Sequence, residues 1–150
     1  MKRRSKSATT PCKRKERVIF FSYEESPDQL IRNLQSVGIN LEPYLKSGLL
    51  IIQASRPSLH GLEMHLLTLH KYIRDFKPKM VIVDPISSLI SQGSTFEVKA
   101  MLVRLIDMLK TNDISAVFTS LTRYGPDDLD TTLEAVSSLS DNWIRLRNLE

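Results

Sequence analysis

Short apolar runs alternate with amphipathic helical patterns along most of the chain. The runs are rich in β-branched and aromatic residues, and each run predicts a strand. The predicted strands are 17–23, 49–54, 79–84, 114–120 and 142–148. Apolar residues at helical spacing fill most of the intervals between them. This alternation is typical of an α/β fold in three layers, with a mostly parallel sheet covered by helices on both faces.

Capping signals define the ends of the predicted helices. Ser26 followed by Pro27, with Gln29 three residues after the serine, is a strong helix start, and Gly38 is a stop signal. The sequence therefore predicts a helix at about 27–37, directly after a pair of acidic residues.

Two further helices are expected. Apolar residues recur at helical spacing over 61–76, and Pro78 ends that segment. A second capping box, Ser94 with Glu97, opens the next helix. Turn-forming residues at 124–128 precede a short helix and the last strand.

Basic residues are concentrated at the amino terminus. Residues 1–17 hold 8 of the 21 basic side chains and one acid, so the remainder carries 13 basic and 16 acidic side chains. Residues 1–16 lack apolar periodicity and are predicted to form a disordered basic arm, followed by one domain at 17–150. The arm has two open interpretations. It makes weak contact with nucleic acid or an acidic partner, or it is a simple solvated tail.

No apolar run approaches the roughly 18 to 20 residues that a membrane helix needs. The amino terminus also has no apolar segment that could act as a secretion signal. A soluble, cytoplasmic protein is therefore expected. The single cysteine, Cys12, cannot form an internal disulfide, which is consistent with a reducing compartment.

Candidate chemistry lies at the carboxyl ends of the predicted strands, where open parallel sheets bind their ligands. The residues expected there carry carboxylates or hydroxyls: Glu24, Glu25, Asp84, Ser87, Ser88, Thr119, Ser120 and Thr122. Mg²⁺ prefers such oxygen ligands, and an acid beside the metal can orient water for phosphoryl transfer. Each residue alone also has a structural interpretation, because acids stabilise helix N-termini and hydroxyls are common in loops.

Nothing in the sequence could cradle the phosphates of a nucleotide. The five glycines stand singly, so no G-x-x-x-x-G-K-[ST] segment occurs among the 150 residues. Without backbone amides and a lysine on the β- and γ-phosphates, the acids would repel ATP. The residues therefore indicate one half of an ATPase site.

Several segments together resemble a known family. They are Phe20 to Ser26, Leu30 to Leu34 with Gly38, Leu49 to Ile52, Phe76 to Asp84 with Ser87, and Tyr124-Gly125 with Ser140 to Ile144. The order of these segments and their amino-acid sequences resemble those of the RecA-like ATPases of the KaiC and RadA type over about residues 17–150. The KaiC branch includes circadian clock proteins.

The resemblance implies a RecA-like P-loop NTPase fold, ATP with Mg²⁺ as cofactors, and hexameric rings. By position, Glu24 and Glu25 match the catalytic acids that activate water. Asp84 matches the Walker B acid that supports the metal, and Ser120 lies near a polar sensor that would contact the cofactor.

The chain departs from the family at both ends. Family members begin with a strand, the Walker A loop and its helix, where this chain has the basic arm, and they continue into later strands that carry a basic motif. The resemblance therefore implies a truncated domain. The phosphate-loop strand is central in the family's sheet, so either the two strands that flank it there pair directly here, or an edge is left that another chain must cover. Self-association or a partner chain is therefore predicted.

Three hypotheses about function follow. The leading one is a truncated KaiC-like domain without independent ATPase activity that acts through protein association. The second is a receiver-type phosphoacceptor module, which also places acids after its first and third strands but needs a Lys after its fifth, where this chain has Arg145 and Arg147. The third is nucleic-acid binding through the basic arm. A functional ATP-binding domain is a further alternative if another chain or segment completes the site.

Overall fold

The computed structural model describes residues 9–56, 61–90, 93–121, 140–142 and 144. Its elements are β1 (Val18–Ser22), α2 (Pro27–Ser36), α3 (Glu42–Lys46), β2 (Leu50–Ala54), α4 (Leu62–Phe76), β3 (Met80–Asp84), α5 (Ser87–Ile90), α6 (Thr95–Thr111) and β4 (Ser115–Phe118). Among these helices, each is too short or too polar to cross a bilayer. Strands and crossover helices alternate as the sequence predicts.

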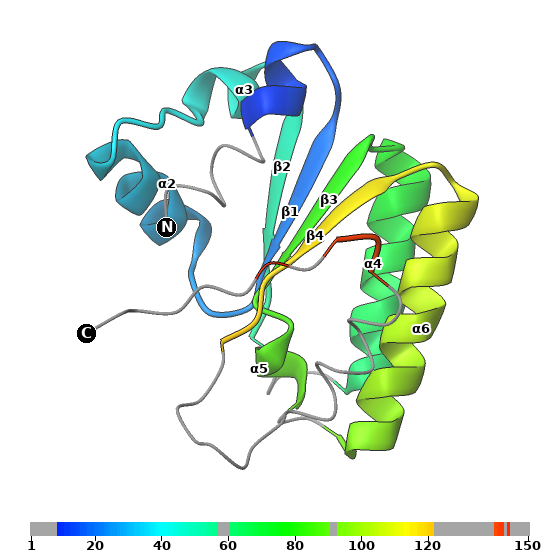
Figure 1. The fold of residues 1–150 in the computed structure, drawn as a ribbon. Coiled ribbons are helices and arrows are strands. Elements are labelled where there is room, and N and C mark those ends of the chain that lie inside the picture. Colours follow the sequence, from blue (N-terminus) through cyan, green and yellow to red (C-terminus); the bar gives the residue numbers. More distant parts are fainter. Residues whose placement is uncertain (1–8, 57–60, 91–92, 122–139, 143, 145–150) are drawn as a thin grey trace.

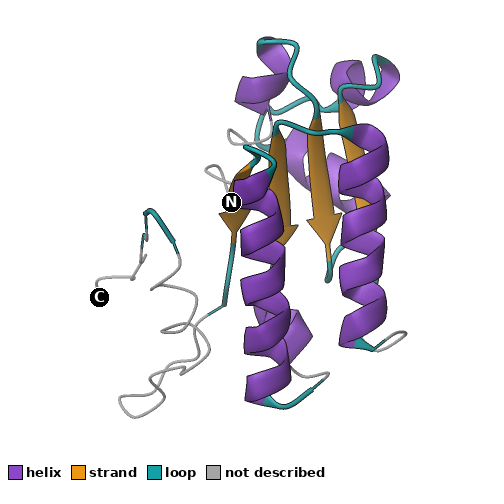
Figure 2. Cartoon of the chain, turned by 90° about the vertical axis from the view of Figure 1, so that its right-hand side faces the viewer, coloured by secondary structure: helices purple, strands orange, loops and turns teal. Residues whose placement is uncertain are grey.

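The four strands are all parallel and lie in the order β2-β1-β3-β4. In the central pair, Val18 of β1 is opposite Met80 of β3, and Ser22 is opposite Asp84. The long helices α4 and α6 lie side by side over one face (Figure 2), and α2 and α3 lie on the other side (Figure 1). The structure confirms the predicted three-layer α/β fold, consistent with part of a RecA-like domain.

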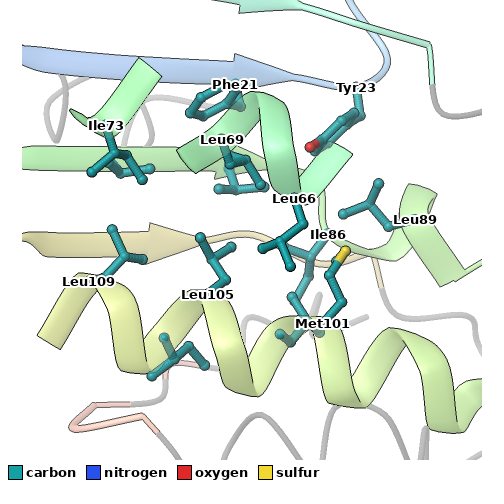
Figure 3. Packing of buried hydrophobic residues seen from close by; sticks show 14 of the residues in the cluster. Phe21, Tyr23, Leu66, Leu69, Ile73, Ile86, Leu89, Met101, Leu105 and Leu109 are labelled. Atoms are coloured by element: carbon teal, nitrogen blue, oxygen red, sulfur yellow. The ribbon is translucent and has the colours of Figure 1, made fainter. Parts of the chain in front are cut away.

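Alternation along the strands sends their side chains into two cores. The larger core lies between the sheet and the helices α4 and α6, which contribute residues such as Leu69 and Leu105 (Figure 3). The smaller core, under α2 and α3, includes Phe20 and Ile82. Because β1 and β3 are covered on both faces, the first four residues of each strand form an unbroken apolar run.

Four predicted strands and three predicted helices are confirmed, with ends that differ by one or two residues. Both capping boxes form, because the hydroxyls of Ser26 and Ser94 accept hydrogen bonds from the amides three residues later. The sequence does not predict α3 or α5, since five and four residues are too few to reveal a helical period. The strand predicted at 142–148 and the turn predicted at 124–128 fall mainly outside the described residues.

The disordered arm predicted for residues 1–16 does not hold for its second half. Residues 9–13 form a helical turn, and the side chain of Cys12 is only 2% exposed in the smaller core. The Cys12 thiol also lies 3.8 Å from the carbonyl oxygen of Leu49, to which it donates a weak hydrogen bond. A single small apolar side chain among lysines and arginines gives no periodic signal, so the sequence does not predict this ordered segment.

The packing of Cys12 can be tested through its reactivity. Burial, together with the charge of Glu16, raises the pKa of the Cys12 thiol to about 11, so little reactive thiolate forms near neutral pH. We expect DTNB to modify the native chain far more slowly than the chain unfolded in guanidinium chloride, at the same pH. Because Cys12 is the single cysteine, the unfolded chain is its own control. Equal rates in the two states would contradict the packed turn.

Candidate functional site

The carboxyl ends of β1, β3 and β4 meet at one edge of the sheet, beside α5 at the lower end of Figure 1. Ser22 and Asp84 are opposite each other in the β1–β3 register. One step beyond, the amide of Tyr23 donates a hydrogen bond of 2.9 Å to the carbonyl of Asp84. The acids that follow β1 and the acid that ends β3 therefore reach the same edge, as the sequence predicts.

A tight turn between β1 and α2 carries Glu24 and Glu25. The buried Ser22 donates its hydroxyl to the Glu25 carbonyl at 2.7 Å and accepts from the Glu25 amide at 3.2 Å. Ser26, the N-cap of α2, follows immediately. The backbone of the acidic pair is thus fixed by a strand on one side and a helix on the other.

The two glutamates face different partners. Glu24 is exposed, and its carboxylate accepts a hydrogen bond of 2.7 Å from the hydroxyl of Ser88, which lies beyond the end of β3. Glu25 is half-buried, and its carboxylate accepts a hydrogen bond of 2.9 Å from the Asn33 side chain on α2. Glu24 therefore extends across the edge toward β3, whereas Glu25 is held against the helix that follows it.

Asp84 is a buried acid at the end of a central strand, with 6% of its surface exposed. The hydroxyl of Thr119 donates a hydrogen bond to its carboxylate. Thr119 is fixed in turn, because its amide donates to the Val83 carbonyl at 3.1 Å and its carbonyl accepts from the Ile86 amide at 2.8 Å. This contact supplies part of the polar environment that a buried carboxylate requires.

Ser120, the predicted cofactor residue, also lies at this edge but does not supply the contact to Asp84. Its hydroxyl oxygen is buried and has no hydrogen-bond partner among the described residues. An unsatisfied buried hydroxyl costs about 1–3 kcal/mol, so a polar ligand would stabilise it. Nearby, Ser87 accepts a hydrogen bond of 3.2 Å from the amide of Leu121.

Tyr23 anchors the acidic turn to the larger core (Figure 3). Its side chain is 4% exposed, and its ring meets the ring of His65 edge-on, with centroids 5.3 Å apart. Burial raises the pKa of the Tyr23 phenol, so this side chain is neutral near neutral pH. Tyr23 therefore gives the turn apolar support and adds no charge beside the acids.

The donor set suits a hard cation. Within the described ranges, no three His, Cys, Asp or Glu side chains are grouped so that they could hold a metal ion. The edge instead offers the carboxylates of Asp84 and Glu24 with the hydroxyls of Thr119 and Ser88. Mg²⁺ is commonly bound by one or two carboxylates and retains several waters, whereas structural zinc requires four ligands, mostly Cys and His.

The sequence predicts that the acids lie at this edge, but it does not assign the contacts that Thr119 and Asn33 make with them. It includes Thr119 among the strand-end residues and selects Ser120, although the β3–β4 register would have put Thr119 level with Asp84. It does not identify Asn33, because no helical or strand period joins residues eight apart across a turn. Thr122 lies outside the described residues.

Known proteins match almost the whole chain. Circadian clock protein KaiC2 of Synechocystis is 44% identical over 144 residues, which are 95% of this chain and 25% of the relative. Circadian clock oscillator protein KaiC of Thermostichus vulcanus is 34% identical over 146 residues, 97% of this chain and 28% of the relative. KaiC of Synechococcus elongatus is 32% identical over the same lengths. The chain spans between 25% and 28% of the length of these relatives.

The strand order alone does not distinguish a KaiC-like domain from a receiver-type module, because receiver-type modules also have the strand order β2-β1-β3-β4. The family model described as "ATPase: KaiC" matches residues 8–150. This match begins beside the ordered turn at 9–13 and includes both acid-bearing strands. The chain therefore belongs to the KaiC family of ATPase domains.

Proposed function

We propose that this chain supplies the metal-holding and water-orienting side of a Mg-ATP site. ATP hydrolysis would then require a phosphate-binding loop from another chain or segment, and association with that element would be the chain's role. The observation that carries the proposal is the meeting of two acid–hydroxyl pairs at one sheet edge, Asp84 with Thr119 and Glu24 with Ser88.

Each acid has a distinct role in this proposal. Asp84, with the adjacent hydroxyl of Thr119, would hold Mg²⁺, which neutralises the charge of phosphate oxygens when bound. Glu24 is exposed at the same edge and would orient the attacking water. Glu25 would shape the turn through Asn33 instead of touching the reacting atoms. Ser120 would contact the cofactor through its buried hydroxyl.

The phosphates of the nucleotide need a binding loop that the proposed site does not itself contain. The 150 residues include no G-x-x-x-x-G-K-[ST] segment, which in other nucleotide sites supplies amides and a lysine to the triphosphate. Carboxylates without those groups repel a polyanion. We therefore expect that the isolated chain does not hydrolyse ATP, although it belongs to a family of ATPase domains. The names of the relatives also suggest a role linked to a circadian clock.

The open edge of β4 is the proposed site of association. The amides of Ser115 and Thr119 donate to β3, so alternation points the amides of Ala116 and Phe118 away from it. The described part of the chain pairs no strand with that side of β4, and Ala116 is exposed. An unpaired strand edge is a template for another strand.

We expect the purified chain to bind Mg-ATP weakly, with a Kd above about 1 mM, because nothing offsets the repulsion between acids and phosphates. Isothermal titration calorimetry would measure this, and Asp84→Asn, which removes one of the repelling carboxylates, should not weaken the binding further. Circular dichroism would confirm that the variant folds. Micromolar binding that Asp84→Asn abolishes would contradict the proposal.

The different roles of the two glutamates predict different effects on stability. Glu25→Ala should lower the free energy of unfolding by about 1 kcal/mol, because the hydrogen bond to α2 is lost. Glu24→Ala should change it by less than about 0.5 kcal/mol, as expected for an exposed side chain. Urea denaturation would measure both, and Glu25→Ala combined with Asn33→Ala should cost less than the sum of the single changes. Equal losses at the two glutamates would contradict the division.

Association through β4 can be blocked at a single amide. Ala116→Pro removes an N–H that points away from β3 and leaves the β3–β4 hydrogen bonds intact. We expect wild-type chain to self-associate at micromolar concentrations in sedimentation experiments and Ala116→Pro to remain monomeric. Ala116→Val, which keeps the amide, is the matched control and should associate like wild type. A wild-type chain that stays monomeric would overturn this part of the proposal.

A further inference from the structure

The amino-terminal edge of the sheet carries the opposite charge to the site just described. Residues 13–17 lead into β1 and residues 74–79 lead into β3, so parallel pairing brings both segments to this edge. Together they hold seven basic and two acidic residues, an excess of +5 that is larger than the net charge of +4 for the whole chain. In Figure 1 the turn of residues 9–13 marks this edge at the upper end of the sheet, opposite α5.

Direct contacts join the two segments. The amide of Lys79 donates a hydrogen bond of 2.8 Å to the carbonyl of Arg17. The guanidinium of Arg17 lies 5.4 Å from the centre of the Phe76 ring. The two segments therefore form one surface. We call it the amino-edge patch and define it by Lys13, Lys15, Arg17, Lys77 and Lys79, all of which are exposed.

The two acids in these segments neutralise little of the charge of the patch. Glu16 pairs with Arg14 at 2.7 Å, and Asp75 pairs with Arg74 at 2.9 Å, so each acid is matched by a base outside the patch. Arg14 lowers the pKa of Glu16 first through its hydrogen bond, and the charges of Arg14 and Lys79 add to that effect. Lys13, Lys15 and Lys77 form no ion pair with any residue that the structure describes.

The chemistry of the patch favours a nucleic-acid backbone over other polyanions. A phosphodiester chain binds through charge alone, by releasing its counterions. A protein interface draws its affinity from buried aromatic or arginine anchors, and a membrane surface takes up exposed apolar side chains. The large exposed apolar side chains of the described residues lie outside both segments, and Phe76 is half-buried beneath Arg17.

Two lysines of the patch occupy positions where glycine would be easier. Lys15 has φ of 63° and Lys77, the C-cap of α4, has φ of 49°. This left-handed conformation favours glycine, because a Cβ atom crowds the backbone there. Replacing either lysine with glycine should therefore remove a charge without harming the fold.

We propose that the amino-edge patch binds the phosphodiester backbone of nucleic acid without sequence preference, at the end of the sheet opposite the acidic site. This surface is independent of ATP and of the proposed β4 edge. It differs from contact through a disordered arm because Lys77 and Lys79 come from the middle of the chain and are placed by the fold.

The test compares two double variants of the full chain that each lose two positive charges. Lys15→Gly with Lys77→Gly changes the patch, and Lys71→Gln with Lys99→Gln changes exposed lysines on α4 and α6. Fluorescence anisotropy with a labelled mixed-sequence DNA duplex gives the affinity over a series of salt concentrations. The patch variant should bind more weakly, and the slope of log K against log salt, which is negative, should become shallower by about two.

The control variant should keep the wild-type slope, and circular dichroism should show both variants folded. A patch variant that binds like wild type would overturn the proposal, as would a control variant that loses as much affinity. Polyglutamate of matched charge is the competing ligand. If it bound as tightly as DNA, the patch would be a site for acidic polypeptides and the assignment to nucleic acid would be wrong.

Discussion

Parallel pairing between β1 and β3 is the constraint on which the rest of the structure depends. Because the strands run in the same direction and are level from Val18–Met80 to Ser22–Asp84, their acidic ends must lie together. The same pairing gathers the basic segments that precede the strands at the other edge. It also requires a crossover of helix and loop between successive strands, which covers both faces and buries all of β1 and all of β3 except Met80. The charge separation of the molecule is thus a consequence of strand direction.

Features with a strong local period could be predicted from the sequence. The strands are apolar runs, α4 and α6 repeat leucine or methionine at helical spacing, and α2 and α6 open with capping boxes that form in the structure. Strand direction followed from the βα alternation, and it was enough to place Glu24 and Asp84 at one edge. These parts were accessible because each depends on residues close together in the chain.

Features that depend on three-dimensional placement could not be predicted in this way. The burial of Cys12 depends on a core built from α2, α3 and the first three strands, and no periodic pattern in the sequence joins Cys12 to them. The contact between Thr119 and Asp84 depends on the register of β4, and a shift of one residue would have selected Ser120 instead. The basic edge could be predicted only in part, because the basic residues before β1 are evident in the sequence but those before β3 join them only through strand pairing.

The turn that carries Glu24 is held differently from the rest of the site. The hydrogen bonds that Ser22 and Asn33 make with Glu25 join residues three or eight positions apart, whereas Glu24 with Ser88 and Asp84 with Thr119 join residues 64 and 35 apart. Short-range contacts form early and persist when distant parts of a domain open or change. The backbone of the acidic turn is therefore fixed largely by contacts close in sequence, and Tyr23 adds an anchor in the larger core. The acidic turn is thus the part of the site whose shape depends least on the distant residues that complete it.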